Sequence, residues 1–202
     1  MNGEIDMLTS FSPITNKVYH ALKKIDVSVD SIEKAKSSYT HAILCVSDCD
    51  KASKNANTKS SFEAYNLAYE ECFINFIRQV YELNSDKAVL VETKLNELDN
   101  VTLLSILTNL DYRDKLLYLD IIKNSSNNAF VARDVRILEL LTRLATRELL
   151  FSTFHFLSKD ITICCQPHLT FPIFVTDFNN IETYIELASN TNLMLCDIQI
   201  KY

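Results

Sequence analysis

Four of the six arginines of the chain fall in one stretch, at Arg133, Arg136, Arg143 and Arg147. If that stretch is helical, the spacing brings the four side chains to one face. A row of guanidinium groups binds carboxylates or phosphates through paired hydrogen bonds. We therefore predict a partner-binding surface for an acidic protein segment. The alternative is a solvent-exposed face with local ion pairs, which contribute little to stability.

A second group with possible chemistry consists of His41, Cys45 and Cys49, which recur at intervals of four residues. On one helix face they would present three ligands for a soft metal, with His20 as a fourth. Structural zinc sites, however, usually take paired ligands from short cysteine loops. Buried thiols beside a surface histidine are the favoured interpretation, and we predict no metal and no cofactor.

Cys164, Cys165 and His168 have the residue types of a Cys/His nucleophile, with Asp160 or Asp177 available to orient the histidine. A reactive thiol needs a lowered pKa, which a nearby cation or a helix N-terminus provides. These cysteines lie in an apolar, alternating segment, where thiols are normally inert. We therefore predict no catalytic residue in this group.

The scarcity of glycine excludes several other chemistries, because Gly3 is the only glycine in the chain. Walker phosphate loops, Rossmann fingerprints and the GxSxG nucleophile elbow all require glycine at fixed positions. Tight hairpins and glycine helix stops are disfavoured for the same reason. His155, which lies among phenylalanines, is expected to be a hydrogen-bonded core histidine.

Composition indicates a globular chain of 202 residues, with 48% hydrophobic and 23% charged residues. A single domain, 1–202, is expected at this length. The net charge of −6 and the pI near 5.2 make nucleic acid an unlikely partner. No apolar run approaches the about 20 residues that span a bilayer, and the N-terminus lacks a signal peptide. We expect an acidic, soluble, cytoplasmic protein with reduced cysteines.

The elements that must position these residues are mainly helices. Apolar periodicity and capping residues predict a first helix from Ser12 and Pro13 to Ile25 and a second over about 30–46. A mobile loop is expected at about 50–61. Further helices are predicted over 62–81, 85–98, 101–110, 113–123 and 180–189, and a long helix over Ala129–Asp160 is expected to be the centre of the fold.

Three stretches alternate with a period of two and predict strands: 161–165, 169–175 and 194–202. Pro172 cannot donate a backbone hydrogen bond, so its strand is expected at an edge or at a bulge. The predicted fold is mainly α (α+β), a multi-helix bundle around the long central helix with a small C-terminal antiparallel sheet.

Without a catalytic motif, the sequence favours a non-enzymatic adaptor, chaperone-like or regulatory protein that acts by protein–protein interaction. The alternative is an enzyme whose site is assembled from residues distant in sequence, such as a Cys/His hydrolase.

Overall fold

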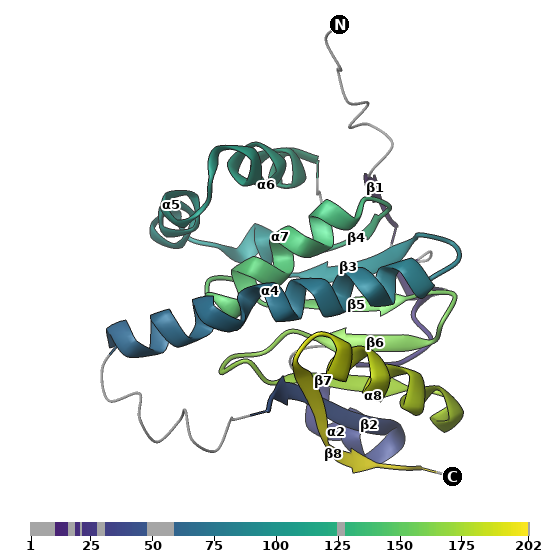
Figure 1. The fold of residues 1–202 in the computed structure, drawn as a ribbon. Helices are drawn as coiled ribbons and strands as arrows, with labels where there is room; N and C mark the ends of the chain where they lie inside the picture. The colour runs from purple at the N-terminus through teal and green to yellow at the C-terminus, as the bar shows by residue number, and fades with distance from the viewer. Residues whose placement is uncertain are drawn as a thin grey trace, which may run out of the picture.

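The fold is organised by one antiparallel sheet of eight strands (Figure 1). The computed structural model describes residues 11–15, 19–20, 22–27, 31–47, 59–124 and 128–201. The strand order is β1-β4-β3-β5-β6-β7-β2-β8. The strands are β1 (Phe11–Pro13), β2 (Thr40–Val46), β3 (Val89–Thr93), β4 (Ala129–Ala132), β5 (Ser152–Phe156), β6 (Ile161–Cys164), β7 (Phe171–Val175) and β8 (Leu193–Gln199).

Helices α4, α7 and α8 form a layer on one face of this sheet, which we call the helical face. There α4 and α7 lie side by side with α8 next to α4, and α5 and α6 lie outside that layer beside α7 (Figure 1). The helices are α2 (Ile32–Ser38), α4 (Lys59–Leu83), α5 (Asn100–Asn109), α6 (Tyr112–Asn124), α7 (Val135–Thr146) and α8 (Ile181–Asn190), with short 3-10 helices η3 (Leu95–Glu97) and η4 (Phe178–Asn180).

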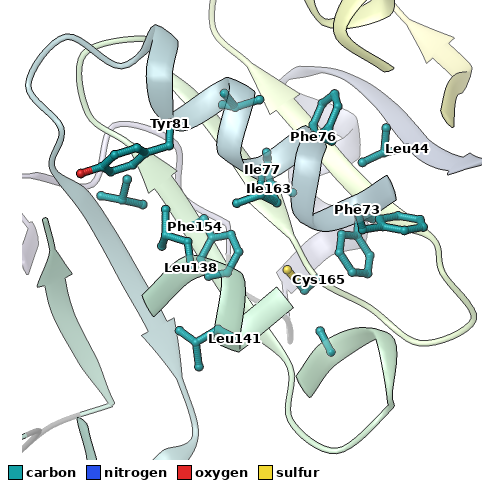
Figure 2. Close-up of a cluster of buried hydrophobic side chains, with 14 of the residues drawn as sticks. Leu44, Phe73, Phe76, Ile77, Tyr81, Leu138, Leu141, Phe154, Ile163 and Cys165 are labelled. Atoms are coloured by element: carbon teal, nitrogen blue, oxygen red, sulfur yellow. The ribbon is translucent and has the colours of Figure 1, made fainter. Parts of the chain in front are cut away.

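The main hydrophobic core lies between the helices and the helical face. Helix α4 contributes Phe73, Phe76, Ile77 and Tyr81, whose spacing gives one apolar stripe. Figure 2 shows these side chains packed with others from α7 and the strands, including Leu138. Burial of this stripe fixes α4 against the sheet, because apolar area removed from water stabilises at about 25 cal/mol per Å².

The opposite face of the sheet is covered by the N-terminal segment and α2, and we call it the N-terminal face. Ile25 and Val27 pack there with Ile32 of α2 against Phe174 of β7. A second cluster on this face includes Leu90 of β3. The strands β2 to β7 are thus buried on both sides, since alternate residues of each strand point to opposite faces.

The predicted long helix over Ala129–Asp160 is wrong. That stretch forms β4, the shorter helix α7 and then β5, separated by turns. The helix ends at Thr146, and Glu148 follows with a left-handed backbone, at φ 56°. A left-handed residue ends a helix in the way that glycine usually does. The predicted bundle around a central helix with a small C-terminal sheet is therefore also wrong, because the sheet draws strands from the whole chain.

Two other predicted helices are wrong for a related reason. The stretch 30–46 contains only the short α2 before it continues as β2, and 85–98 contains β3 and η3. Both strands are buried on both faces, so their apolar residues do not alternate with polar ones. Ser12 and Pro13, expected to start a helix, belong to β1.

Other predicted elements are confirmed. The described residues include helices that match 62–81, 101–110, 113–123 and 180–189, and strands that match the three alternating stretches. The loop predicted at about 50–61 lies mostly outside the described residues, and α4 already begins at Lys59.

The expectation for Pro172 is wrong, because β7 lies inside the sheet between β6 and β2. Pro172 pairs with Ile43 of β2, whereas the ladder with β6 extends only from Ile173 to Val175. The missing N–H of Pro172 therefore falls where the ladder with β6 has ended.

The two edges of the sheet differ. Strand β1 is three residues long and contains Pro13. Strand β8 is longer, but its register against β2 shifts between His41 and Ile43. Asp197 has a left-handed backbone at this point, with φ 52°, as expected for a β-bulge.

Candidate functional site

The four arginines of the predicted partner-binding surface do not act as one group. Arg133 lies between β4 and α7 and is exposed. Arg136 pairs with Asp134, and the same carboxylate caps α7 by accepting a hydrogen bond from the backbone N–H of Arg136 at 2.9 Å. Arg136 therefore belongs to the first turn of α7, and its partner Asp134 is the N-cap of the helix.

Arg143 and Arg147 are held by carboxylates of the chain itself. Arg147 binds both carboxylate oxygens of Glu70 in α4, at 2.7 Å and 2.8 Å. Arg143 lies 3.4 Å from Glu70 and also pairs with Asp114 of α6. Arg147 further donates to the carbonyl of Asn109 at the end of α5. These four charged side chains, which we call the arginine clasp, join α4 and α7 to the outer pair of helices.

The clasp is largely removed from water. The Glu70 side chain is 13% exposed, and each of the two arginine side chains is 23% exposed. Burial raises the pKa of Asp114, although the charge of Arg143 opposes this effect. Binding of an acidic partner by these arginines stays a prediction, and such a partner would have to compete with Glu70 and Asp114.

Exposed apolar side chains lie on both helices that the clasp holds. They are Val101, Leu104, Tyr112, Leu116 and Leu119, with residue exposures from 45% to 78%, and we call these five residues together the hairpin surface. On α5, Val101 and Leu104 are three positions apart. On α6, Tyr112, Leu116 and Leu119 follow one another at spacings of four and three. Each helix therefore presents one exposed apolar stripe.

The opposite sides of α5 and α6 pack into the main core. Ile106 of α5 and Tyr118 and Ile121 of α6 are buried there. Asp99 caps α5 by accepting from the N–H of Thr102 at 2.7 Å, and Asp111 accepts from the N–H of Asp114 at 2.9 Å. Asp is a preferred N-cap residue, so both caps can be recognised in the sequence, whereas the outer stripes were not predicted. The available signal was that these short helices are apolar on two sides, whereas a surface helix normally has one apolar stripe.

A buried polar cluster lies on the N-terminal face of the sheet, centred on Glu92 of β3. Its Oε1 accepts from the Tyr19 hydroxyl at 2.9 Å, lies 3.1 Å from Lys23 Nζ and is 2.7 Å from His155 Nε2. On β5, His155 Nδ1 is 2.9 Å from the Thr162 hydroxyl of β6. These five residues form the Glu92 cluster. Register places Glu92, His155 and Thr162 together because β3, β5 and β6 are neighbours, and the N-terminal segment adds Tyr19 and Lys23.

Hydrogen bonding fixes the protonation of this cluster near neutral pH. Burial works against charge on Glu92, but the hydrogen bond with His155 and the charges of His155 and Lys23 outweigh it and lower its pKa. Burial lowers the pKa of His155 and outweighs the influence of Glu92. A carboxylate can only accept, so Nε2 of a neutral His155 carries the proton and Nδ1 accepts from Thr162.

The row Thr162, His155 and Glu92 has the order of a nucleophile, a base and an orienting carboxylate. Thr162 is only 1% exposed, however. The adjacent pocket has room for about one water molecule. It is lined by residues that include Lys24, Leu157 and Ile161. With the described residues of the N-terminal segment in this position, the pocket leaves no room for a substrate beside the Thr162 hydroxyl.

The cysteines of the predicted Cys/His group are buried, and His168 lies at the surface. Burial raises the pKa of Cys164 to about 12, and it raises the pKa of Cys165 as well. The His168 ring lies 3.4 Å from Glu148, which also accepts from the backbone N–H of His168. Both thiols therefore stay protonated at neutral pH, because burial in apolar surroundings disfavours the charged thiolate.

The carboxylates considered for that group have other partners, since Asp160 pairs with Lys24 and Asp177 caps η4. His41 and Cys45 lie on strand β2, not on a helix, and Cys49 lies outside the described residues. Among the residues that are described, no cluster of three or more potential metal ligands occurs.

No protein-family model, curated protein or solved structure matches the chain. Within the described ranges, the helices are all too short or too polar to cross a bilayer. Function is therefore inferred from the arrangement of the chain's own residues.

Proposed function

We propose that the protein is a non-enzymatic adaptor or regulatory protein that binds its partner through the hairpin surface. The observation that carries this proposal is the exposure of five large apolar side chains on two short, capped helices. Single exposed apolar residues are ordinary, but a group of this kind marks an interaction surface.

The chemistry of the surface favours an amphipathic helix of another protein as the occupant. Five side chains of this size expose a few hundred Å², which is the size of a functional patch on a monomer. A stable dimer usually buries about 800 Å² on each partner, which is more than this surface offers to a second copy. A partner helix with apolar residues at spacings of three and four matches the spacing of these stripes.

The arginine clasp supports the proposal because it holds the hairpin in place. Its ion pairs join α6 to α7 and α4 at the side away from the exposed stripes. A surface that is fixed before binding loses less conformational freedom when a partner docks, and this improves affinity.

A selection from a displayed library of random helical peptides tests the proposal. The wild-type protein should select peptides with apolar residues at helical spacing, and these should slow hydrogen exchange in α5 and α6. The double variant Leu104→Asp plus Leu116→Asp should weaken binding of the selected peptides by about tenfold or more, because it places charge on both stripes.

The matched control is Leu67→Asp, which changes an exposed leucine of α4, 53% exposed, outside the hairpin. It should leave peptide binding unchanged. Equal loss in the control, or protection of amides elsewhere on the protein, would contradict the proposed surface. Concentration-dependent dimers abolished by the double variant would assign the surface to a second copy instead.

A second candidate function is a hydrolase with Thr162 as nucleophile, favoured by the hydrogen-bonded row from Thr162 through His155 to Glu92. This function requires the N-terminal segment to move away from the sheet. A fluorophosphonate probe would then label Thr162 in the wild-type protein and not in His155→Gln. An unlabelled Thr162 in folded wild-type protein would eliminate this candidate.

A further inference from the structure

Two cysteines from distant parts of the chain meet at the edge of the sheet. Cys45 lies on β2 and Cys196 on the edge strand β8, and their sulfur atoms are 2.8 Å apart. In the register, Cys45 is opposite Met194 and Cys196 is opposite Ile43, so the two thiols are diagonal neighbours on the same face of the sheet. The Cys196 thiol also lies 3.3 Å from the carbonyl oxygen of Ile43.

We propose that Cys45 and Cys196 are a redox modification site, at which a hydroperoxide converts the two thiols into a reversible disulfide. The sulfur atoms need to approach by less than about 1 Å to bond. This site is independent of the hairpin surface, because β8 and α5–α6 are different parts of the fold.

The two thiols have different access to the oxidant. Cys196 is half-buried at the edge, whereas Cys45 is buried behind it. The Cys196 thiolate attacks one oxygen of hydrogen peroxide and breaks the O–O bond, which gives a sulfenic acid and hydroxide. The Cys45 sulfur then attacks the Cys196 sulfur and forms the S–S bond. The thiol proton and the sulfenic hydroxyl leave as water, so peroxide takes up the two electrons that the thiols lose.

The neighbouring cysteines of the core provide an internal contrast. Cys164 and Cys165 are adjacent in sequence and completely buried, and burial raises the pKa of both thiols. A protonated, enclosed thiol does not react with peroxide. These two core thiols therefore do not compete with the pair at the edge for the oxidant.

The disulfide would fix the edge strand beside its bulge. Cys196 directly precedes Asp197, where the left-handed backbone interrupts the register with β2. A covalent link at this point would oppose local opening of β8, which as an edge strand has a neighbour on only one side.

The test is to treat the purified full chain with hydrogen peroxide, alkylate the remaining thiols, digest the protein and map the linked peptides by mass spectrometry. The expected product is a Cys45–Cys196 peptide pair that dithiothreitol separates, together with slower hydrogen exchange in β8 of the oxidised protein. Oxidation of Cys196 to a sulfinic acid with Cys45 still alkylated would overturn the proposal. A link between either cysteine and Cys49 would overturn it as well.

Two variants assign the order of reaction. In Cys45→Ser, the sulfenic acid on Cys196 has no resolving thiol, so dimedone should trap it there. In Cys196→Ser, peroxide should leave Cys45 alkylatable. Cys72→Ser, which changes a half-buried thiol of α4, is the control and should form the link as the wild type does. If a variant fails to fold, the wild-type peptide map alone decides the pairing.

Discussion

The two faces of the sheet are stabilised in different ways, although the same strands build both. On β5, Phe154 and Phe156 point into the apolar core of the helical face, whereas His155 between them points into the Glu92 cluster. The helical face is held by close packing, which does not depend on protonation. The N-terminal face adds a buried carboxylate, a lysine and a histidine, so its stability depends on charge.

This contrast shows where the chain can open without losing its core. Among its described residues, the N-terminal segment contributes only Ile14, Ile25 and Val27 as buried apolar side chains, and its polar contacts with Glu92 come from Tyr19 and Lys23. Regions with few buried apolar contacts open at lower free energy than a main core. The four predictions below test the difference, beginning with the largest effect.

The largest effect is expected from Phe154→Ala on the helical face. Phe154 is fully buried, and removing its ring leaves a cavity that should lower the free energy of unfolding by about 3 to 5 kcal/mol. Urea denaturation measures this change. Phe178→Ala is the matched control, because Phe178 is 41% exposed and should cost less than about 1 kcal/mol. Similar costs for both changes would mean that Phe154 is not part of a tightly packed core.

On the N-terminal face, Glu92→Gln removes the nearer and more buried of two carboxylates beside Lys23, and leaves only the exposed Asp26, at 3.6 Å. The Lys23 side chain is 9% exposed and would stay buried with its closest counter-charge gone, so we expect a loss of about 2 to 3 kcal/mol in the free energy of unfolding. Glu82→Gln breaks an exposed ion pair with Lys87 and should cost less than about 1 kcal/mol. If Glu92→Gln and Glu82→Gln lower the free energy of unfolding by the same amount, the Glu92 cluster contributes no more to stability than an exposed ion pair.

The helical side has its own charged group in the arginine clasp, at the rim of the core. Arg143→Ala plus Arg147→Ala leaves Glu70 without a cation and should lower the free energy of unfolding by about 1 to 2 kcal/mol. Arg136→Ala, on the first turn of the same helix, should cost about 0.5 kcal/mol or less. Hydrogen exchange should also accelerate in α5 and α6 of the double variant. A double variant as stable as the wild type would show that the clasp is only a surface feature.

The smallest effect concerns pH. The pKa of His155 is lowered from an ordinary value of 6.5, and that of Glu92 from 4.5. Below these values the unfolded chain binds more protons than the folded protein, so stability is present at neutral pH and is lost as pH falls. We expect a loss on the order of 1 kcal/mol between about pH 7 and 5. His155→Gln should flatten this dependence, whereas an unchanged profile would exclude His155 as its source.

Several elements of the fold could be predicted from the sequence because their patterns are local. Helix α4 has one apolar stripe, and α5 and α6 begin at Asp99 and Asp111. The strands β2, β3 and β5 could not be found in the same way. Each is buried on both faces, so Val89, Leu90 and Val91 give a continuous apolar run that fits a helix equally well.

The turns were hidden as well, because the chain places other residues where glycine is usual. Lys87, Glu148 and Asp160 have positive φ values of 46°, 56° and 48°. Lys87 precedes β3 and Glu148 follows α7, and neither boundary is predicted by the apolar pattern of the sequence. Of the candidate site, the caps of the hairpin were predictable. The Glu92 cluster was not, because it requires knowledge of which strands are neighbours.

The different ends of the sheet also bear on self-assembly. A sheet with two open edges can add strands from other molecules and grow into aggregates. At one edge β1 is short and contains a proline, which cannot donate to an incoming strand. At the other edge β8 contains the bulge at Asp197, and a bulge increases the local twist and hinders the pairing of a new flat strand. We therefore expect concentrated protein to resist fibril formation, and straightening the bulge by deleting Asp197 should make β8 the point from which fibrils grow.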